Sequence, residues 1–181
     1  MRLIIFILFP VAALALNCPR TVSTSPQLTE WLFQIGLGEC VKATSDQTRF
    51  PTQAQALPKV GPLFQPAVER TLLQRPELVL VDRSSDERGY VQTMKRLKID
   101  VERLDLHTVD GLLGASVGIS TRWGRTDAQA LLQPTQASWK KLTDSKPLQS
   151  KSFIAFTWME PAILFGQETF LSDLFTSVGA E

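Results

Sequence analysis

The sequence predicts an α/β fold, with a doubly wound parallel-sheet first lobe, a long connecting helix and the start of a second α/β lobe. Helix-type and strand-type hydrophobic patterns alternate along the chain, which is typical of parallel sheets with right-handed crossovers. Residues 78–81 (LVLV) are apolar at every position, as a strand covered by helices on both faces requires. Pro76 disfavours helical backbone at Arg75, so the helical pattern before this strand should end there.

The elements of the first lobe follow from local signals. Pro26 suits a first helical turn because it has no backbone N–H to leave unsatisfied, and Gly36 and Gly38 should end that helix. Thr108 is expected to cap a later helix. The expected strands of this lobe are 20–24, 40–44, 58–61, 78–81 and 99–104. The expected helices are 27–37, 65–75, 84–97 and one after Thr108. Val68, Leu72 and Leu73 share one face of the second helix, and Ser84 and Ser85 should cap the third, with Glu87 in capping-box position.

The remaining chain predicts a connection and a partial lobe. A helix is expected at 127–142, where Pro134 should kink or interrupt it, followed by a polar linker at 144–151. A strand at 152–158 and a helix from Thr169 to Val178, closed by Gly179, should follow. The expected division is therefore 1–15 signal peptide, 16–126 first lobe, 127–151 connecting helix and linker, and 152–181 partial second lobe. A lone βα unit cannot cover both sheet faces, so residues 153–181 should be the least stable part.

The first residues indicate export. Arg2 precedes an apolar run that is shorter than the ~20 residues of a membrane-spanning helix. Ala13 and Ala15 stand at the two positions that a signal peptidase reads, so cleavage after Ala15 and a periplasmic protein are expected. A lipid anchor at Cys18 is the alternative, but Asn17 does not fit the small residue expected before a lipidated cysteine.

Composition and motifs argue for a binding protein. The formal net charge is +1 and no basic run is present, which argues against a nucleic-acid partner. The sequence contains no nucleophile elbow, phosphate-binding loop or dinucleotide fingerprint, and its one histidine, His107, is expected to be a polar loop residue. We therefore expect no enzymatic activity, no cofactor and no protein-bound metal.

The two cysteines, Cys18 and Cys40, are expected to form a structural disulfide in an exported protein. If the strands that follow them are parallel neighbours, both cysteines lie at the same sheet edge, away from a crevice at the opposite strand ends. The alternative is a free buried thiol at Cys40 and an exposed or lipidated Cys18.

Several stretches resemble the periplasmic substrate-binding proteins of ABC importers for iron-siderophores, haem and vitamin B12. They are 20–30 (RTVSTSPQLTE), 46–55 with its Phe-Pro pair, 69–81 (ERTLLQRPELVLV), and 153–156 and 173–180, which are similar to the first strand and helix of the family's second lobe. The resemblance covers nearly all of residues 20–181, and the order of these stretches carries it rather than one specific motif.

The resemblance implies two α/β lobes joined by a rigid helix, with a ligand in the cleft between them and a membrane permease as partner. An acidic residue on each lobe docks on the permease, and Glu69 stands at the first-lobe position. Family members continue for several βα units beyond a sequence like that of 178–180, so a truncated second lobe is expected. The alternative is a truncated non-transport relative that acts as a partner-binding module.

The crevice is expected at the carboxyl ends of the parallel strands. The candidate ligand-binding residues there are Ser25, Thr44, Asp46, Leu63, Phe64, Arg83 and Trp158. Phe64 and Trp158 could instead be core residues, and Arg83 could pair with neighbouring acids instead of a ligand. The expected ligand is a metal chelate: a siderophore, haem or corrinoid. Leu63 and Asp82 stand where vitamin B12 binders of the family carry aromatic residues, which disfavours a corrinoid.

Overall fold

The computed structural model describes residues 18–83 and 87–181, without the side chains of residues 87 and 88. The expected signal peptide and the expected cap at Ser84 and Ser85 lie outside the described residues. Across the described ranges, no helix is both long and apolar enough to cross a lipid bilayer.

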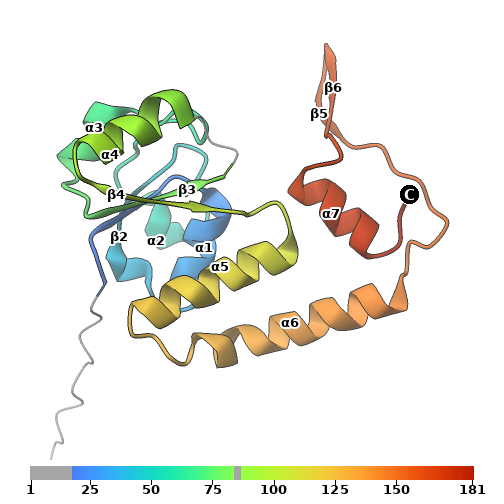
Figure 1. Cartoon of the computed structure of the whole chain (residues 1–181). Helices are drawn as coiled ribbons and strands as arrows, with labels where there is room; N and C mark the ends of the chain where they lie inside the picture. The colour runs from blue at the N-terminus through green and yellow to red at the C-terminus, as the bar shows by residue number, and fades with distance from the viewer. Residues whose placement is uncertain (1–17, 84–86) are drawn as a thin grey trace, which may run out of the picture.

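A four-stranded parallel sheet forms the centre of the first lobe (Figure 1). Its strands are β1 (Thr21–Ser23), β2 (Val41–Thr44), β3 (Leu78–Asp82) and β4 (Asp100–Leu104), in the order β2-β1-β3-β4. Each neighbouring pair is parallel, which confirms the predicted sheet type. Chain order and spatial order differ at β1, so the sheet is wound outward in both directions from this strand.

Helices cover both faces of this sheet. They are α1 (Pro26–Gln34), α2 (Thr52–Gln55), α3 (Val68–Leu73), α4 (Gln92–Arg96), α5 (Val109–Arg122), the short 3₁₀ and π segments Gly38–Cys40 and Glu87–Val91, the connecting helix α6 (Ala128–Ser145) and α7 (Phe170–Ser177). Figure 1 shows α3 and α4 on one face of the sheet and α1 and α5 on the other, with α6 lying beside α5.

Strand β3 packs against a hydrophobic cluster on each face of the sheet, which explains why apolar and polar residues do not alternate in its sequence. Leu78 and Leu80 belong to the cluster formed with α1, α5 and the start of α6. Val79 and Val81 belong to a second cluster on the opposite face, which includes Met94. All five β3 residues are buried, as predicted for a strand that serves two cores.

Local capping sets the helix ends, with Pro26, Gly36 and Thr108 in their predicted places and an additional cap at Ser25. Ser25 Oγ accepts a hydrogen bond from Leu28 N, with Pro26 in the first turn of α1. Gly36 has a φ of 76° just after α1, a left-handed conformation that glycine adopts without a Cβ clash. Thr108 Oγ1 accepts from Gly111 N at 2.8 Å, which starts α5.

The region between β2 and β3 differs from the prediction. Residues 58–61 form only an isolated bridge, between Thr44 and Lys59, and the helix α2 was not predicted. The helix predicted at 65–75 shrinks to α3, because Ala67 N donates to Val60 O and holds the preceding chain outside the helix. Val68 and Leu72 pack against the second cluster, whereas Leu73 is 77% exposed, so the prediction that these three residues share one face is wrong for Leu73.

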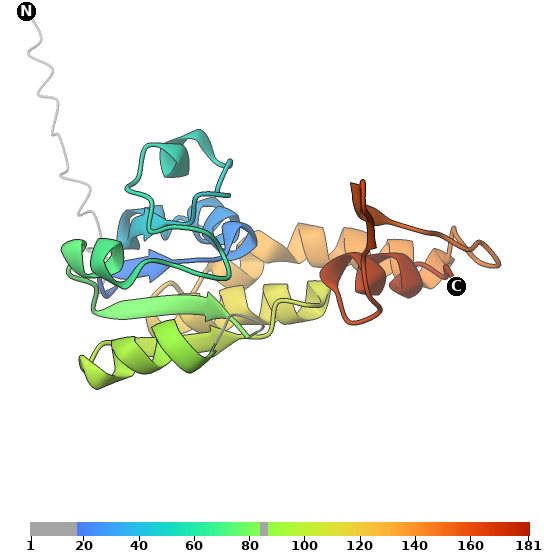
Figure 2. The ribbon, with the colours of Figure 1, turned by 90° about the horizontal axis from the view of Figure 1, so that it is seen from above.

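The connection and the partial second lobe also differ in detail. Helix α6 runs through Pro134 to Ser145 instead of being interrupted there, so the expected linker begins later than predicted. The single strand predicted at 152–158 is an antiparallel hairpin of β5 (Phe156–Met159) and β6 (Ala162–Leu164). Figure 2 shows α6 running alongside α5 and carrying the chain to the hairpin and α7.

Candidate ligand-binding cleft

A cleft of about 510 Å³ lies where the first lobe meets the partial second lobe. Parallel strands end at the same sheet edge, so the segments that follow β1, β3 and β4 converge there. The first lobe contributes Ser25, Pro26, Gln27, Leu63, Phe64, Asp82, Leu106 and His107, and the second contributes Phe165, Glu168, Thr169 and Phe170. Most of this wall is apolar or aromatic, with separate polar groups, which is typical of small-molecule sites.

The polar side of the cleft is centred on His107. Its Nε2 lies 3.7 Å from Asp82 Oδ1, and its Nδ1 lies 3.3 Å from Asp105 Oδ1. Asp82 is 8% exposed at the end of β3, whereas Asp105 is largely exposed and also lies 3.4 Å from Arg83 Nη1. Two carboxylates therefore flank the imidazole at the cleft edge, and an arginine stands behind one of them.

A direct hydrogen bond joins the two parts beside the cleft. Val109 N, at the start of α5, donates to Asp173 Oδ2 in the first turn of α7 at 3.2 Å. A carboxylate is favourable at this position because the amino end of a helix carries partial positive charge. Thr169 caps α7 through Ser172 N, so both helices begin at this junction.

Three of the predicted ligand-binding residues lie together at the cleft: Ser25, Leu63 and Phe64. Phe64 is 56% exposed, so it lines the cleft and is not a core residue. The cleft thus combines the residue that caps α1 with two side chains from the loop before α3.

The other predicted residues lie elsewhere and stay predictions as ligand contacts. Thr44 is buried, and its Oγ1 accepts from Lys59 Nζ at 2.8 Å. Asp46 is exposed, and the side chain of Arg83 lies against Asp105. Trp158 is 64% exposed in β5, where its Nε1 donates to Glu160 O, and it is not among the described residues that line the cleft.

The sequence-based prediction missed several lining residues. Leu106 and His107 follow β4 directly, so the same strand-end rule could have identified them. Phe165, Glu168 and Phe170 are near the cleft only because the hairpin turns the chain back toward α5, and no local pattern signals that path.

The groups with shifted pKa values lie outside the cleft wall. Burial lowers the pKa of Lys59, and nearby Asp46 raises it by a smaller amount. Burial raises the pKa of Tyr90 to about 12, against a smaller opposite effect of its hydrogen bond with Thr71. The hydrogen bonds that Arg122 donates to the Glu102 carboxylate raise the pKa of Arg122, against a smaller opposite effect of burial. Among the described residues, no group of three or more His, Cys, Asp or Glu side chains is placed to hold a metal ion.

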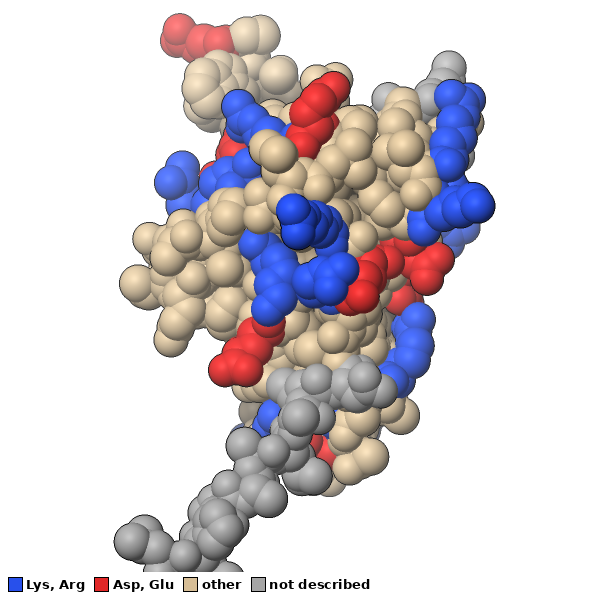
Figure 3. All heavy atoms as spheres, turned by 90° about the vertical axis from the view of Figure 1, so that its left-hand side faces the viewer, with Lys and Arg blue, Asp and Glu red and all other residues tan. Residues whose placement is uncertain are grey.

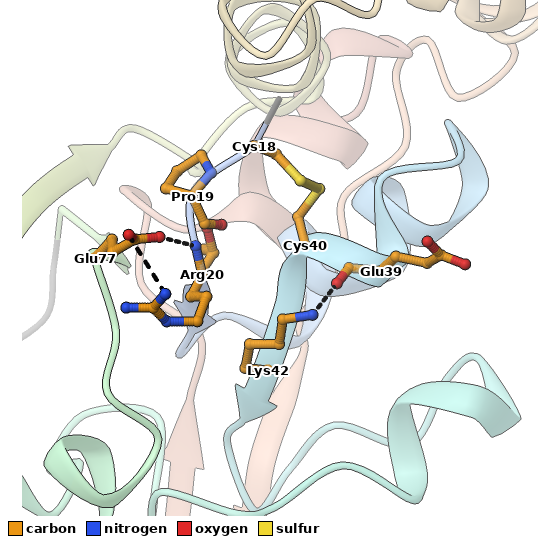
Figure 4. The surroundings of a disulfide bond; sticks show 8 residues. Cys18, Pro19, Arg20, Glu39, Cys40, Lys42 and Glu77 are labelled. Carbon is orange, nitrogen blue, oxygen red and sulfur yellow. Dashed lines mark hydrogen bonds and ion pairs between the residues drawn. A yellow bond between two sulfur atoms is a disulfide. The ribbon is translucent and has the colours of Figure 1, made fainter. Parts of the chain in front are cut away.

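The predicted disulfide is confirmed at the other end of the sheet. Cys18 and Cys40 are bonded, with their Cα atoms 5.8 Å apart. They precede β1 and β2, so the bond ties the amino ends of these neighbouring strands (Figure 4). Glu77, just before β3, binds Arg20 beside the bond and holds a third strand to the same edge.

The outer surface of the first lobe carries mixed charge. On the side that faces away from the partial second lobe, Lys and Arg side chains gather near the middle, with Asp and Glu beside them (Figure 3). Glu69, the predicted docking residue, is exposed in the first turn of α3.

Comparison with known proteins identifies the fold and its relatives. The chain is 25% identical over 170 residues to the vitamin B12-binding protein of Pectobacterium atrosepticum, over 90% of this chain and 61% of that protein. It superposes with a TM-score of 0.78 and 19% identity on the periplasmic vitamin B12 binding protein of Vibrio cholerae, covering 90% of this chain and 65% of that one. The periplasmic heme binding protein of Vibrio cholerae gives 0.72 and 22%, over 90% and 64% of the two chains.

These relatives are named as binding proteins, in agreement with the prediction of a binding protein rather than an enzyme. No protein-family model matches the chain. The chain spans about 61% of the length of the curated relative. Sequence and fold similarity thus agree with the predicted resemblance to the periplasmic substrate-binding proteins that are named for vitamin B12 and heme.

Proposed function

We propose that the chain is the periplasmic substrate-binding component of an ABC importer and captures a metal chelate, a siderophore, haem or corrinoid, for delivery to a membrane permease. The cleft between the first lobe and the partial second lobe is the observation that carries this proposal. It lies at the carboxyl ends of the strands, where open α/β sheets bind their ligands.

The cleft wall suits a flat, partly apolar ligand. Phe64 approaches from the first lobe, and Phe165 and Phe170 approach from the second, so aromatic side chains face the space from both sides. Ser25 and His107 supply polar groups that could fix the orientation of a ligand. Such a wall binds a chelate through its organic shell, with no requirement for a protein-bound metal.

Direct titration tests ligand capture. The purified protein is titrated with haemin, cyanocobalamin and the hydroxamate chelate ferrioxamine B, and binding is followed by tryptophan fluorescence. We expect saturable binding of at least one probe, and a loss of about tenfold or more in Phe64→Ala and Phe170→Ala, because aromatic anchors in a site contribute about 1.4 kcal/mol or more each. Phe50→Ala is the matched control, since Phe50 is 66% exposed and outside the cleft wall. Equal losses in all three variants, or no binding of any probe, would contradict the proposal.

Delivery to a permease is proposed to involve Glu69. The family resemblance assigns docking to an acid at this position, and the side chain is exposed in the first turn of α3. A negative charge there also interacts favourably with the helix dipole and stabilises the folded protein by about 0.3–1 kcal/mol. Glu69→Ala should leave folding and chelate binding nearly intact but reduce transport in cells that depend on this protein. Unchanged transport would leave Glu69 as a helix-start charge only.

A partner-binding module is the second candidate function. The β5–β6 hairpin and its flanks expose several large apolar side chains: Ile154, Phe156, Trp158, Met159, Ile163, Leu164 and Phe165. Exposed apolar patches of this kind mark interaction surfaces. A photo-crosslinker at position 163 should capture a protein in the periplasm if this function holds, and a protein that stays uncrosslinked while it binds chelate would argue for the importer function alone.

A further inference from the structure

Basic side chains gather at the edge of the first-lobe sheet that lies opposite the cleft. Figure 3 views the side of the first lobe that faces away from the partial second lobe, and it shows Lys and Arg side chains near the middle of that side. Helix α3 ends there before β3, and helix α4 ends there before β4. The two helix ends contribute Arg75, Lys95, Arg96 and Lys98, all of them exposed. We call these four residues the amino-edge basic surface.

Backbone contacts hold the two helix ends next to each other. Arg20 Nε donates to Arg75 O at 3.0 Å, and Glu77 N donates to Arg20 O at 2.8 Å. Asp100 N donates to Glu77 O at 3.3 Å, and Lys98 lies two residues before Asp100. The segments that carry Arg75 and Lys98 therefore lead into neighbouring strands of one sheet edge.

The acidic side chains of this edge do not neutralise the basic surface. Glu77 pairs with Arg20, at 3.5 Å between Oε1 and Nη1, and the other acids of this edge, Glu39 and Asp100, are exposed. Within the described part of the chain, no ion pair joins any residue of the amino-edge basic surface to an acid. The surface thus concentrates positive charge in a chain whose formal net charge is only +1.

Two exposed leucines lie among these cations. Leu97 is 49% exposed and stands between Arg96 and Lys98, and Leu73 is 77% exposed and stands two residues before Arg75. Basic side chains attract the anionic headgroups of a bilayer, and apolar side chains beside them enter the boundary between headgroups and acyl chains. A soluble polyanion would have no use for the leucines, so the combination favours a lipid surface.

The ordinary role of cations at helix ends does not explain this combination. Arg75 and Lys98 have φ values of 49° and 58°, the left-handed conformation in which glycine most often follows a helix. A cation at the carboxyl end of a helix interacts favourably with the helix dipole, which accounts for basic residues there. That interaction does not require an exposed leucine beside the cation, yet both helix ends have one.

We infer that the amino-edge basic surface binds the surface of an anionic phospholipid bilayer, with its cations on the headgroups and with Leu73 and Leu97 at the acyl boundary. This inference goes beyond the proposed function and does not depend on it. The cleft lies at the carboxyl ends of the same strands, so it would stay open to a ligand while the opposite edge contacts the membrane.

Vesicle flotation tests the inference. The exported protein is mixed with vesicles of phosphatidylcholine that contain about 30% phosphatidylglycerol, or with vesicles of phosphatidylcholine alone. We expect binding to be at least about fivefold tighter on the anionic vesicles, and the difference to shrink at high salt. The mass of each preparation is measured, so that any retained signal peptide or lipid is the same in all variants. Such an anchor would raise binding to both kinds of vesicle and would not create the difference between them.

A triple variant assigns the effect to the amino-edge basic surface. Replacing Lys95, Arg96 and Lys98 together by glutamine should weaken binding to the anionic vesicles about tenfold or more, because each basic residue near an anionic surface contributes about fivefold. The matched control replaces three exposed lysines at the end of α6 and just after it by glutamine: Lys141, Lys146 and Lys151. It removes the same charge, and Lys146 has a left-handed φ of 43° like Lys98. Circular dichroism checks that both variants are folded.

A leucine variant distinguishes a bilayer from another anionic partner. Leu73→Gln keeps every charge and should weaken binding to the anionic vesicles about threefold or more, because its apolar side chain no longer enters the bilayer. Unchanged binding in Leu73→Gln, with a loss in the triple variant, would point to a soluble polyanion and overturn the assignment to lipid.

The remaining outcomes are also decisive. Equal binding to the two kinds of vesicle, unchanged binding in the triple variant, or an equal loss in its control would overturn the inference. None of these results would affect ligand capture in the cleft, which is measured separately by titration.

Discussion

The first lobe buries both faces of its sheet, whereas the β5–β6 hairpin buries neither. Every residue of β3 is covered by helices on two sides, but every residue of β5 and β6 is exposed. Both segments are rich in apolar side chains, so composition alone does not separate them. The difference lies in what covers each segment, and it predicts that the stability of this chain is concentrated in the first lobe.

The sharpest test of this contrast is a truncation in each region. Leu80→Ala removes a fully buried β3 side chain and should lower the free energy of unfolding by about 2–5 kcal/mol. Ile163→Ala removes an exposed β6 side chain and should change it by less than about 0.5 kcal/mol. Urea unfolding followed by tryptophan fluorescence measures both, since Trp123 is buried in the first-lobe cluster. Similar losses of unfolding free energy in Leu80→Ala and Ile163→Ala would contradict the contrast between the buried sheet and the exposed hairpin.

The disulfide should stabilise the first lobe only. It joins residues separated by 22 positions, for which the chain-entropy model gives roughly 3 kcal/mol. Replacing Cys18 and Cys40 together by serine should lower the stability of the sheet by that order, with amide exchange in the hairpin unchanged. Mass spectrometry of the unreduced protein should show two hydrogens fewer than the reduced protein, and freely alkylated cysteines would contradict the bond.

High pH should weaken the first lobe through Tyr90. Burial raises the pKa of its phenol to about 12 in the folded state, against an unfolded value near 10. The folded protein therefore keeps its proton longer, and this contribution is present below about pH 10 and is lost as the pH rises toward 12, by up to roughly 2–3 kcal/mol.

Tyr90 is the chain's one tyrosine, so phenolate absorbance reports it alone. The absorbance midpoint should lie well above 10 in the folded protein. Tyr90→Phe should lose the extra decline in stability that the unmodified protein shows between pH 10 and 12, while the decline caused by lysine titration should persist. A midpoint near 10 would show that the phenol is not buried in solution.

The smallest expected effect concerns the junction of the two regions. Asp173→Ala removes the acceptor of the Val109 amide and so deletes one charge-assisted hydrogen bond. The free energy of local opening, measured by hydrogen exchange, should fall by about 1 kcal/mol at the start of α5 and in α7. Asp173→Asn keeps an acceptor and should have less effect. Strand β3 should keep its protection in both variants; if β3 loses as much as α7, the two regions unfold as one unit.

Patterns within the first lobe predicted its architecture well, because local and tertiary preferences agree there. The apolar run of β3, Pro26 at the start of α1, the cap at Thr108 and the glycine at position 36 each act through neighbouring residues. The late start of α3 was not predicted because it depends on the backbone contact between Ala67 and Val60, and no local pattern contains that contact.

The candidate site divides in the same way. The strand-end rule found Ser25, Leu63 and Phe64, and it could also have found His107, because topology alone places these residues. Glu168 was not predicted, since its position depends on the antiparallel turn of the hairpin and on how α7 meets α5.

Helix α6 is packed against the first lobe mainly at its amino end. It is 18 residues long, and its buried side chains, Ala128 and Leu132, both lie in its first turns. At a rise of ~1.5 Å per residue the helix extends over roughly 27 Å. A tilt of about 5° at its buried amino end would therefore move its carboxyl end by about 2 Å. The hydrogen bond from Val109 N to Asp173 Oδ2 joins α5 to α7 separately from α6. We therefore expect that exchanging Leu132 for a smaller residue changes ligand binding, although Leu132 does not line the cleft.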